Sequence, residues 1–167
     1  MRFWLTLILG TIAVSGSLTW IYLRMEAANF PAIQLQSGGG PLPLVAVPGH
    51  DFQGDPKTVV LKHEKSEMNV EYRLSVPVAN RGQGNLVLTL ARKTCGCIRG
   101  VFLDDAPCPE GFQFTLAPEQ QKQVTVVWKY TPSETKPDQD RRFAVEFVTN
   151  DPETPVFRIE VNTHVVQ

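Results

Sequence analysis

An alternation of apolar and polar residues, repeated in segment after segment, constrains the fold of this chain more than any other feature of its sequence. Successive side chains of a β-strand point to opposite faces, so this pattern is typical of a strand with one buried and one wet face. Turn-forming Asn, Asp, Gly and Pro residues separate the alternating segments. The segments that show the pattern are 70–78, 85–90, 123–130, 143–147 and 157–165.

Weaker strand signals raise the expected number of strands to about seven or eight. They lie at 42–47, 59–62 and 112–115. That number and spacing predict an all-β domain, an immunoglobulin-like β-sandwich of roughly 110–120 residues. Trp128 and Tyr130 fall on one alternating segment and are expected in its core. Pro77 lies inside another and lacks an N–H, so we expect a sheet edge or a bulge there.

An apolar stretch without a charged residue runs from Phe3 to Leu23. As a helix rising 1.5 Å per residue it would span roughly 30 Å, the thickness of the hydrocarbon core of a membrane. The alternative is a cleaved signal peptide, with Arg2 as its basic region and Ala13-Val14-Ser15 as a cleavage site. Hydrophobicity continues past that site to Leu23, so we expect a retained transmembrane helix.

With this retained transmembrane helix as an anchor, we expect a single-pass membrane protein with four parts. Residues 1–2 form a cytoplasmic tail, 3–23 the transmembrane helix, 24–42 a flexible linker and 43–167 the immunoglobulin-like domain. Gly38, Gly39 and Gly40 make the linker flexible. The short N-terminus with Arg2 is expected inside, which places the domain in the periplasm or outside the cell.

Net charge argues against a nucleic-acid partner. The whole chain carries −1. Without Arg2, Arg24 and Glu26, which precede the domain, 14 basic residues face 16 acidic ones, giving −2. Binding to phosphate backbones requires a basic face, so nucleic acid is excluded as an expected partner.

Three cysteines, Cys95, Cys97 and Cys108, would lie in a compartment that permits disulfides. The simplest structural interpretation pairs Cys108 with Cys95 or Cys97, which stabilises a short loop by roughly 3 kcal/mol. One thiol is then left over. A second interpretation is that all three are functionally silent free thiols.

Two further interpretations give the cysteines a chemical role. Cys95 and Cys97 could both reach a soft ion such as Cu(I), with Cys108 as third ligand. Zinc fits less well, because it usually requires Cys-x2-Cys spacing and a fourth ligand, and no pattern places a histidine. Alternatively, a Cys95–Cys97 disulfide forms a small ring of the kind that exchanges readily. Arg92, Lys93 and Arg99 are close in sequence, but the sequence does not place a cation beside the thiols.

No other motif predicts chemistry. Asp104, Asp105 and Asp151 show no calcium-ligand spacing, and Asp151 before Pro152 is better interpreted as a turn residue bonded to its own backbone. No nucleophile elbow, phosphate loop or pair of catalytic carboxylates is recognisable. We therefore expect no catalytic residues, no resident cofactor and a protein that is not an enzyme.

Four short motifs, in this order, carry a family resemblance. They are Val76-Pro77-Val78-Ala79-Asn80-Arg81-Gly82, Thr94-Cys95-Gly96-Cys97, Leu116-Ala117-Pro118-Glu119 and Thr149-Asn150-Asp151-Pro152. Together they resemble a bacterial family of secreted or membrane-anchored domains of unknown function, related to Hydin-like (ASH-type) immunoglobulin folds. The resemblance covers roughly residues 43–166. Two departures are Gln120 beside Glu119, where the family usually has Pro-Gly-Glu, and Cys108 in an added loop. It implies a sandwich outside the cytoplasm and no established activity.

These observations favour a non-enzymatic binding or scaffolding role, with a protein partner that meets edge strands or end loops. The alternative function is a thiol protein that binds copper or exchanges disulfides through Cys95, Cys97 and Cys108.

Overall fold

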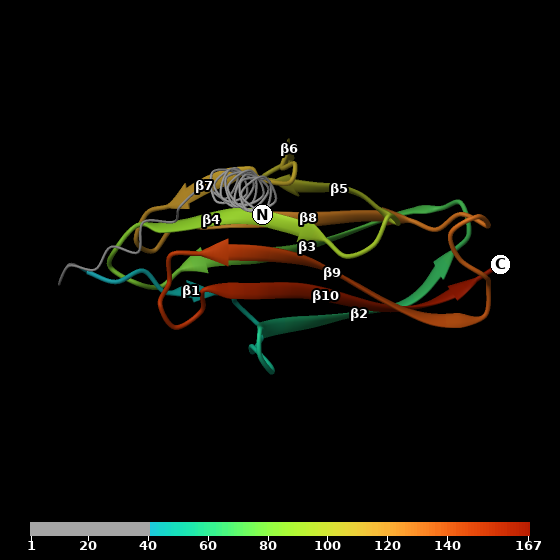
Figure 1. Ribbon diagram of the computed structural model, residues 1–167, viewed down its shortest axis with the longest axis horizontal. Coiled ribbons are helices and arrows are strands. Elements are labelled where there is room, and N and C mark those ends of the chain that lie inside the picture. Colours follow the sequence, from blue (N-terminus) through green and yellow to red (C-terminus); the bar gives the residue numbers. More distant parts are fainter. Residues whose placement is uncertain (1–40) are drawn as a thin grey trace, which may run out of the picture. The chain divides into compact units, whose positions relative to one another are not determined.

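Two five-stranded sheets pack face to face across residues 41–167, the part of the chain that the computed structural model describes (Figure 1). The sheet orders are β1-β3-β8-β5-β6 and β2-β10-β9-β4-β7. The strands are β1 (Val45–Ala46), β2 (Lys57–Glu67), β3 (Glu71–Asn80), β4 (Leu86–Lys93), β5 (Ile98–Leu103), β6 (Ala106–Pro107), β7 (Gln113–Leu116), β8 (Gln121–Lys129), β9 (Gln139–Thr149) and β10 (Val156–Val166).

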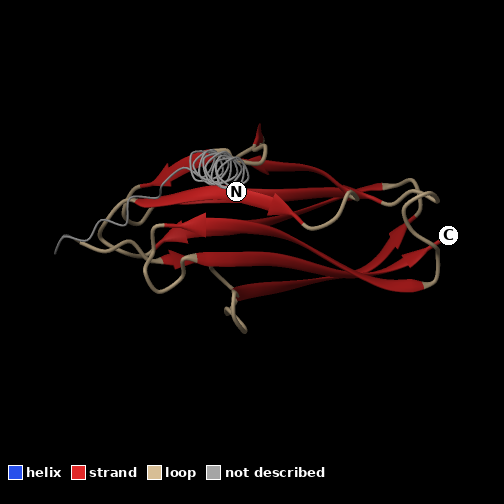
Figure 2. Cartoon of the chain, in the orientation of Figure 1, coloured by secondary structure: helices blue, strands red, loops and turns tan. Residues whose placement is uncertain are grey.

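The predicted all-β, immunoglobulin-like sandwich is confirmed, because strands and connecting loops make up the whole described region (Figure 2). Eight of the ten strands have four residues or more. No helix in residues 41–167 is long and apolar enough to cross a membrane. The predicted cytoplasmic tail 1–2, the transmembrane helix 3–23 and nearly all of the linker 24–42 lie outside the described residues.

Alternation along the strands builds the core between the sheets. In β10 every second residue from Phe157 to Val165 is buried, and the residues between them are half-buried. Phe157 stacks on Phe147 of β9 with ring centroids 5.2 Å apart. Trp128 and Tyr130 are 0% and 1% exposed, which confirms that they belong to the core.

Strand β5 was missed by the sequence pattern, and a bulge explains why. Its pairing with β8 shifts register between Ile98 and Gly100, which interrupts the alternation of inward and outward residues. The Phe102 ring lies over Gly100 on the outer face, where a Cβ on residue 100 would come within 2.7 Å of it. A larger residue at position 100 would displace the Phe102 ring, and the glycine at the bulge weakened the strand signal.

Two long strands are paired along one side only for most of their length. Strand β3 pairs with β8 from Glu71 to Ala79, but with β1 only at Ala79 and Asn80. Pro77 therefore lies on an edge, as predicted. Strand β2 runs parallel to β10 and, on its other side, makes a single bridge between Gln53 and Thr58.

Buried polar side chains hold together the end of the sandwich where the described chain begins. The Asn80 side-chain amide donates to the carbonyl oxygens of Gly84 and Leu116, and its Oδ1 accepts from the Gly82 N–H at 2.9 Å. The backbone of residues 41–44 lies directly on Gly82 and Gly84, where a Cβ would collide with it. The motif that contains Asn80 and Gly82 therefore holds the segment that enters the domain, and we call this arrangement the Asn80 clamp.

The Thr149-Asn150-Asp151-Pro152 motif clamps the same end. The Asp151 carboxylate is 1% exposed and accepts hydrogen bonds from the backbone N–H groups of Val45 and Glu153, both at 2.9 Å. Asn150 Oδ1 accepts from the Val87 N–H at 2.8 Å. The predicted turn role of Asp151 is confirmed, and its second bond ties the β9–β10 turn to β1.

Candidate functional site

The Cys95-Gly96-Cys97 turn connects β4 of one sheet to β5 of the other. The structure joins Cys95 and Cys97 in a disulfide. Cys97 is 1% exposed, whereas Cys95 is half-buried against the core and Gly96 is exposed. The backbone N–H of Cys97 donates to Cys95 Sγ at 3.1 Å. The disulfide therefore lies at the surface end of the core, a full length of β4 away from the Asn80 clamp.

Cys108 is a buried free thiol elsewhere in the core. Its backbone N–H donates to the Val101 carbonyl at 2.8 Å, and Val101 lies four residues beyond Cys97 along β5. At about 3.3 Å per strand residue this separation is roughly 10 Å or more, beyond the reach of a disulfide. The expected pairing of Cys108 with Cys95 or Cys97 is therefore wrong. Burial raises the pKa of the Cys108 thiol to about 11, so it is a poor source of thiolate.

Of the three cations near the cysteines in sequence, only Arg99 contacts the turn. It donates to the Gly96 and Lys129 carbonyl oxygens, each at 3.3 Å, and forms an ion pair with Glu134 at 2.7 Å. Hydrogen bonds from Thr131 and then from Arg99 lower the pKa of Glu134. Arg92 instead pairs with Glu146. The positive charge at the turn is thus already compensated.

The structure does not assemble the proposed copper ligands. Cys95 and Cys97 are bonded to each other, and Cys108 lies apart from them. Within residues 41–167, no three His, Cys, Asp or Glu side chains are grouped so that they could hold a metal ion. His164 Nδ1 lies 2.8 Å from Asp140 Oδ1, while His63 packs against the Trp128 ring with centroids 5.2 Å apart.

His63 belongs to a buried polar cluster that closes the core near the end of β2. The Ser66 hydroxyl accepts from Trp128 Nε1 at 3.1 Å and shares a hydrogen bond with the Thr163 hydroxyl at 2.9 Å. His63 Nδ1 lies 3.3 Å from the same Ser66 oxygen. Ser66 is 0% exposed, so this serine–histidine contact is structural and gives no nucleophile that a substrate could reach.

A row of three charged side chains crosses the outer face of the β2-β10-β9-β4-β7 sheet. Strand register aligns Arg92 of β4, Glu146 of β9 and Arg158 of β10. Glu146 lies between the two arginines and pairs with both. Its side chain is 8% exposed, and the hydrogen bond from Arg92, followed by that from Arg158, lowers its pKa despite this burial. We call Arg92, Glu146 and Arg158 the closed row, because its central carboxylate is enclosed by its neighbours.

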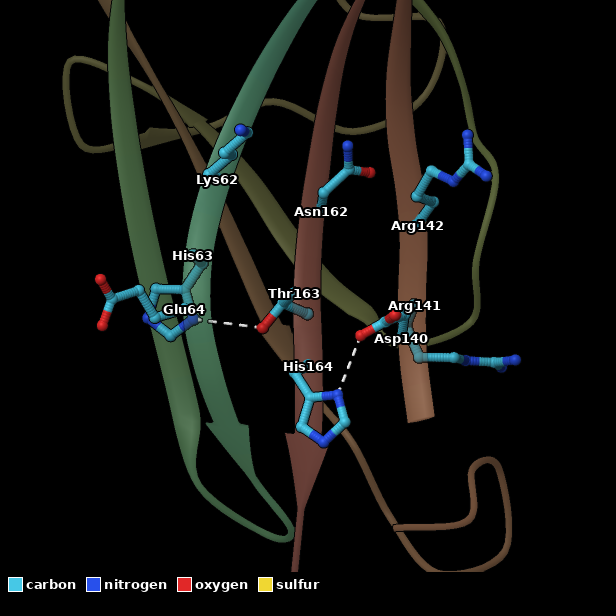
Figure 3. A pocket seen from close by; sticks show the side chains of 9 residues that line it. All are labelled: Lys62, His63, Glu64, Asp140, Arg141, Arg142, Asn162, Thr163 and His164. Atoms are coloured by element: carbon cyan, nitrogen blue, oxygen red, sulfur yellow. Dashed lines mark hydrogen bonds and ion pairs between the residues drawn. The ribbon is translucent and has the colours of Figure 1, made fainter. Parts of the chain in front are cut away.

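A second row crosses the same face with an amide at its centre. Register aligns Lys62 of β2, Asn162 of β10 and Arg142 of β9, and the three side chains extend to the same side of the sheet (Figure 3). They line a groove of about 430 Å³. Asn162 Oδ1 is buried and has no hydrogen-bond partner. We call Lys62, Asn162 and Arg142 the open row.

The cations of the open row form no ion pair with the acidic side chains near them. Among the ion pairs of residues 41–167, none involves Lys62 or Arg142. The acidic Asp140 is held by His164, and Glu64 extends away from the three side chains of the row (Figure 3). Sequence reasoning missed both rows because each joins the β9–β10 hairpin to a strand far from it in sequence, β4 or β2, and only the register of these strands aligns the side chains.

Comparison with known proteins identifies neither a family nor an activity for this chain. No family model matches this chain, and no curated protein matches it in sequence. Solved structures similar to it include the CARDB domain of the PF1109 protein from Pyrococcus furiosus, at 13% identity, a TM-score of 0.39 and coverage of 78% of this chain and 100% of that one. The ASH/PapD-like domain of human CEP192 matches at 9% identity and a TM-score of 0.43, covering 65% and 81%. The periplasmic chaperone SfaE matches at 10% and 0.43, covering 72% and 56%. The immunoglobulin-like sandwich therefore rests on the two packed sheets described above.

Proposed function

We propose that this protein is a membrane-anchored, non-enzymatic binding or scaffolding module whose immunoglobulin-like domain lies outside the cytoplasm. The observation that carries this proposal is the pair of long edges, β2 beyond Thr58 and β3 before Ala79, that are paired on one side only. Such edges present backbone donors and acceptors to which a partner strand can add.

The structural roles of the motifs support a binding role over catalysis. The polar side chains of the motifs form hydrogen bonds to the backbone at one end of the sandwich, as seen for Asn80, Asn150 and Asp151. The polar motif residues that could have been catalytic thus have a structural role in the domain. We therefore expect the protein to bind its partner through its sheet edges and outer faces.

Site-specific photo-crosslinking of the full chain in its native membrane tests the proposal. A photoreactive residue at Glu64 on β2 or Ser75 on β3 should yield a discrete crosslinked protein. The same residue at Ala117, an exposed loop position at the clamped end, serves as control. Identical products from all three positions would contradict recognition at the edges.

The anchor and its orientation need a separate measurement. Intact mass of the membrane-extracted protein should include residues 1–23, and protease added outside spheroplasts should digest the domain. A mass that begins beyond residue 23 would establish cleavage, and protection from external protease would reverse the orientation.

A second candidate function is disulfide exchange at Cys95 and Cys97. The observation that favours it is their bond across the exposed Gly96, at a site where Cys95 remains half-buried. Thiol counting and intact mass, before and after mild reduction and Cu(I) addition, test this function. Reversible reduction of this pair would support exchange, stoichiometric Cu(I) would support metal handling, and an unreactive bond would exclude both.

A further inference from the structure

The two ends of the Cys95–Cys97 disulfide are unequally exposed. Cys97 is 1% exposed and belongs to the core, whereas Cys95 is half-buried. A thiolate that opens a disulfide must reach one of its two sulfur atoms. Because nearly all of the exposed surface of the pair belongs to Cys95, an incoming thiolate meets this residue and not Cys97.

Gly96, the residue between the two cysteines, leaves the approach to the disulfide open. Its φ lies outside the left-handed region, so the backbone does not require glycine here. Apart from the two neighbouring cysteines, a Cβ at this position would meet no heavy atom within 4 Å, so packing does not require glycine either. The missing side chain instead leaves the exposed turn uncovered.

Hydrogen bonds that do not involve sulfur hold both flanks of the turn. The Thr94 N–H donates to the Ala144 carbonyl at 3.0 Å, and Thr94 Oγ1 accepts from the Ala144 N–H at 2.8 Å. On the other flank, the Cys97 carbonyl accepts from the Lys129 N–H at 3.0 Å. The Cα atoms of the two cysteines lie 5.1 Å apart, and these bonds keep them close when the disulfide opens. A reduced pair held in this way is positioned to close again.

A further hydrogen bond favours negative charge on the exposed sulfur. The Cys97 backbone N–H donates to Cys95 Sγ at 3.1 Å. Such a donor stabilises a thiolate more than a neutral sulfur, because the charge on the acceptor is larger. In the reduced pair, Cys95 is therefore the accessible sulfur and also a supported nucleophile.

We propose that Cys95 is the sulfur through which this domain exchanges disulfides with a dithiol of a partner protein, and that Cys97 is the resolving cysteine. The inference rests on disulfide exchange, the second candidate function. It deepens that function, because it names the attacked atom and the class of substrate.

The exchange proceeds through a mixed disulfide on Cys95. A partner thiolate attacks Cys95 Sγ, the Cys95–Cys97 bond breaks, and its electron pair leaves on Cys97 Sγ, which takes up a proton. The partner's second thiolate then attacks its own sulfur in the mixed disulfide, and Cys95 leaves with the electron pair and is protonated. The partner dithiol has lost two electrons and two protons, which the two cysteines have gained. In the reverse direction Cys95 attacks a partner disulfide, and Cys97 then attacks Cys95 Sγ and releases the partner as a dithiol.

The reactivity of each cysteine without the other tests the assignment. In Cys97→Ala and Cys95→Ala of the full chain in detergent micelles, intact mass follows the formation of a mixed disulfide with oxidised glutathione. We expect Cys97→Ala, which retains Cys95, to react about tenfold faster or more, because a buried thiol is inert. Both variants lose the same bond and keep the buried Cys108, so each is the other's control. Equal rates, or a faster reaction at Cys97, would overturn the proposal.

A measurement on the wild-type chain does not depend on how a cysteine variant folds. The disulfide is opened with reduced glutathione, free thiols are blocked with iodoacetamide, and peptide fragmentation locates the glutathione. We expect glutathione on Cys95 and the blocking group on Cys97. Glutathione mainly on Cys97, or reduction without a mixed disulfide on Cys95, would overturn the proposal.

Gly96→Val tests the open approach. The added side chain meets no neighbour outside the turn, so circular dichroism should show an intact fold. Reduction of the disulfide by dithiothreitol should slow about threefold or more, because exchange depends on access to the attacked sulfur. Ala117→Val, at the exposed loop position of the clamped end, is the control and should keep the wild-type rate. An unchanged rate for Gly96→Val, or equal slowing in the control, would overturn the approach over Gly96.

Failure of this assignment and failure of disulfide exchange give different results. A wild-type pair that resists both dithiothreitol and glutathione would exclude exchange, and the roles of the two cysteines with it. A pair that is reduced reversibly but through Cys97 would leave exchange standing and refute the assignment alone. Crosslinking from the β2 and β3 edges is independent of both outcomes.

Discussion

The closed row and the open row cross the same face of one sheet and differ chiefly at their central residue. Each places two cationic side chains around a residue of β9 or β10. Glu146 forms an ion pair with both Arg92 and Arg158, whereas the neutral Asn162 forms none with Lys62 or Arg142. One carboxylate thus decides whether the two cations of a row are joined by ion pairs within the sheet.

The largest expected effect comes from breaking the closed row at its centre. Glu146→Gln leaves two arginines beside a neutral amide on a side chain that is 8% exposed. We expect it to lower the free energy of unfolding by about 2 kcal/mol, less than a fully buried pair because Arg92 is exposed to water. Urea unfolding followed by near-ultraviolet circular dichroism measures this, with Glu160→Gln on the same face as control. Equal losses for the two variants would contradict a special role for Glu146.

The closed row should also make stability depend on pH. The pKa of Glu146 is lowered below its usual 4.5 by Arg92 and Arg158. A carboxyl whose pKa is lower in the folded state contributes stability above its unfolded pKa, and this contribution is lost as pH falls through the folded value. The stability difference between wild type and Glu146→Gln should therefore be constant above about pH 5 and shrink below pH 4.5. A difference that persists undiminished into strong acid would refute the assigned cause.

The outer arginines sharpen the comparison with a smaller effect. Arg158→Gln removes one of two partners of Glu146 and should cost about 1 kcal/mol. Arg142→Gln occupies the corresponding flank of the open row, where no ion pair is lost, and should stay within about 0.5 kcal/mol of wild type. Parallel urea titrations of the two variants give the answer. If Arg142→Gln proves the more harmful, the open row is internally compensated after all.

The sequence predicted the sandwich but neither row. Period-two alternation locates β3, β8 and β10 because their inward-facing side chains recur at every second position, most regularly in β10. It missed β5, where the bulge at Gly100 interrupts the period. The rows depend on how the β9–β10 hairpin aligns with β4 and β2, strands distant from it in sequence, and the β2–β10 pair is parallel with a shift between Thr163 and His164. A single sequence contains no local signal for such alignment.

The cysteines illustrate the same limit. Their spacing allowed three pairings, and a choice among them required the path of the chain around β5. The hydrogen bond from Cys108 to Val101 places Cys108 well along this strand, while Cys95 and Cys97 stay together in the turn before it. The turn at Asp151-Pro152 was easier to predict from the sequence, because its hydrogen bond joins residues only two positions apart.

Conversion of the open row into a closed one is the last prediction. Asn162→Asp replaces the amide nitrogen by a second oxygen and so places one negative charge between the two cations Lys62 and Arg142. We expect a gain of about 0.5 kcal/mol in the free energy of unfolding at neutral pH, because the flanking side chains remain partly in water. Conversely, this gain should disappear below about pH 4, where the new carboxyl is protonated. A variant that is less stable than wild type at neutral pH would show that the two cations do not converge on position 162, and the comparison between the rows would fail.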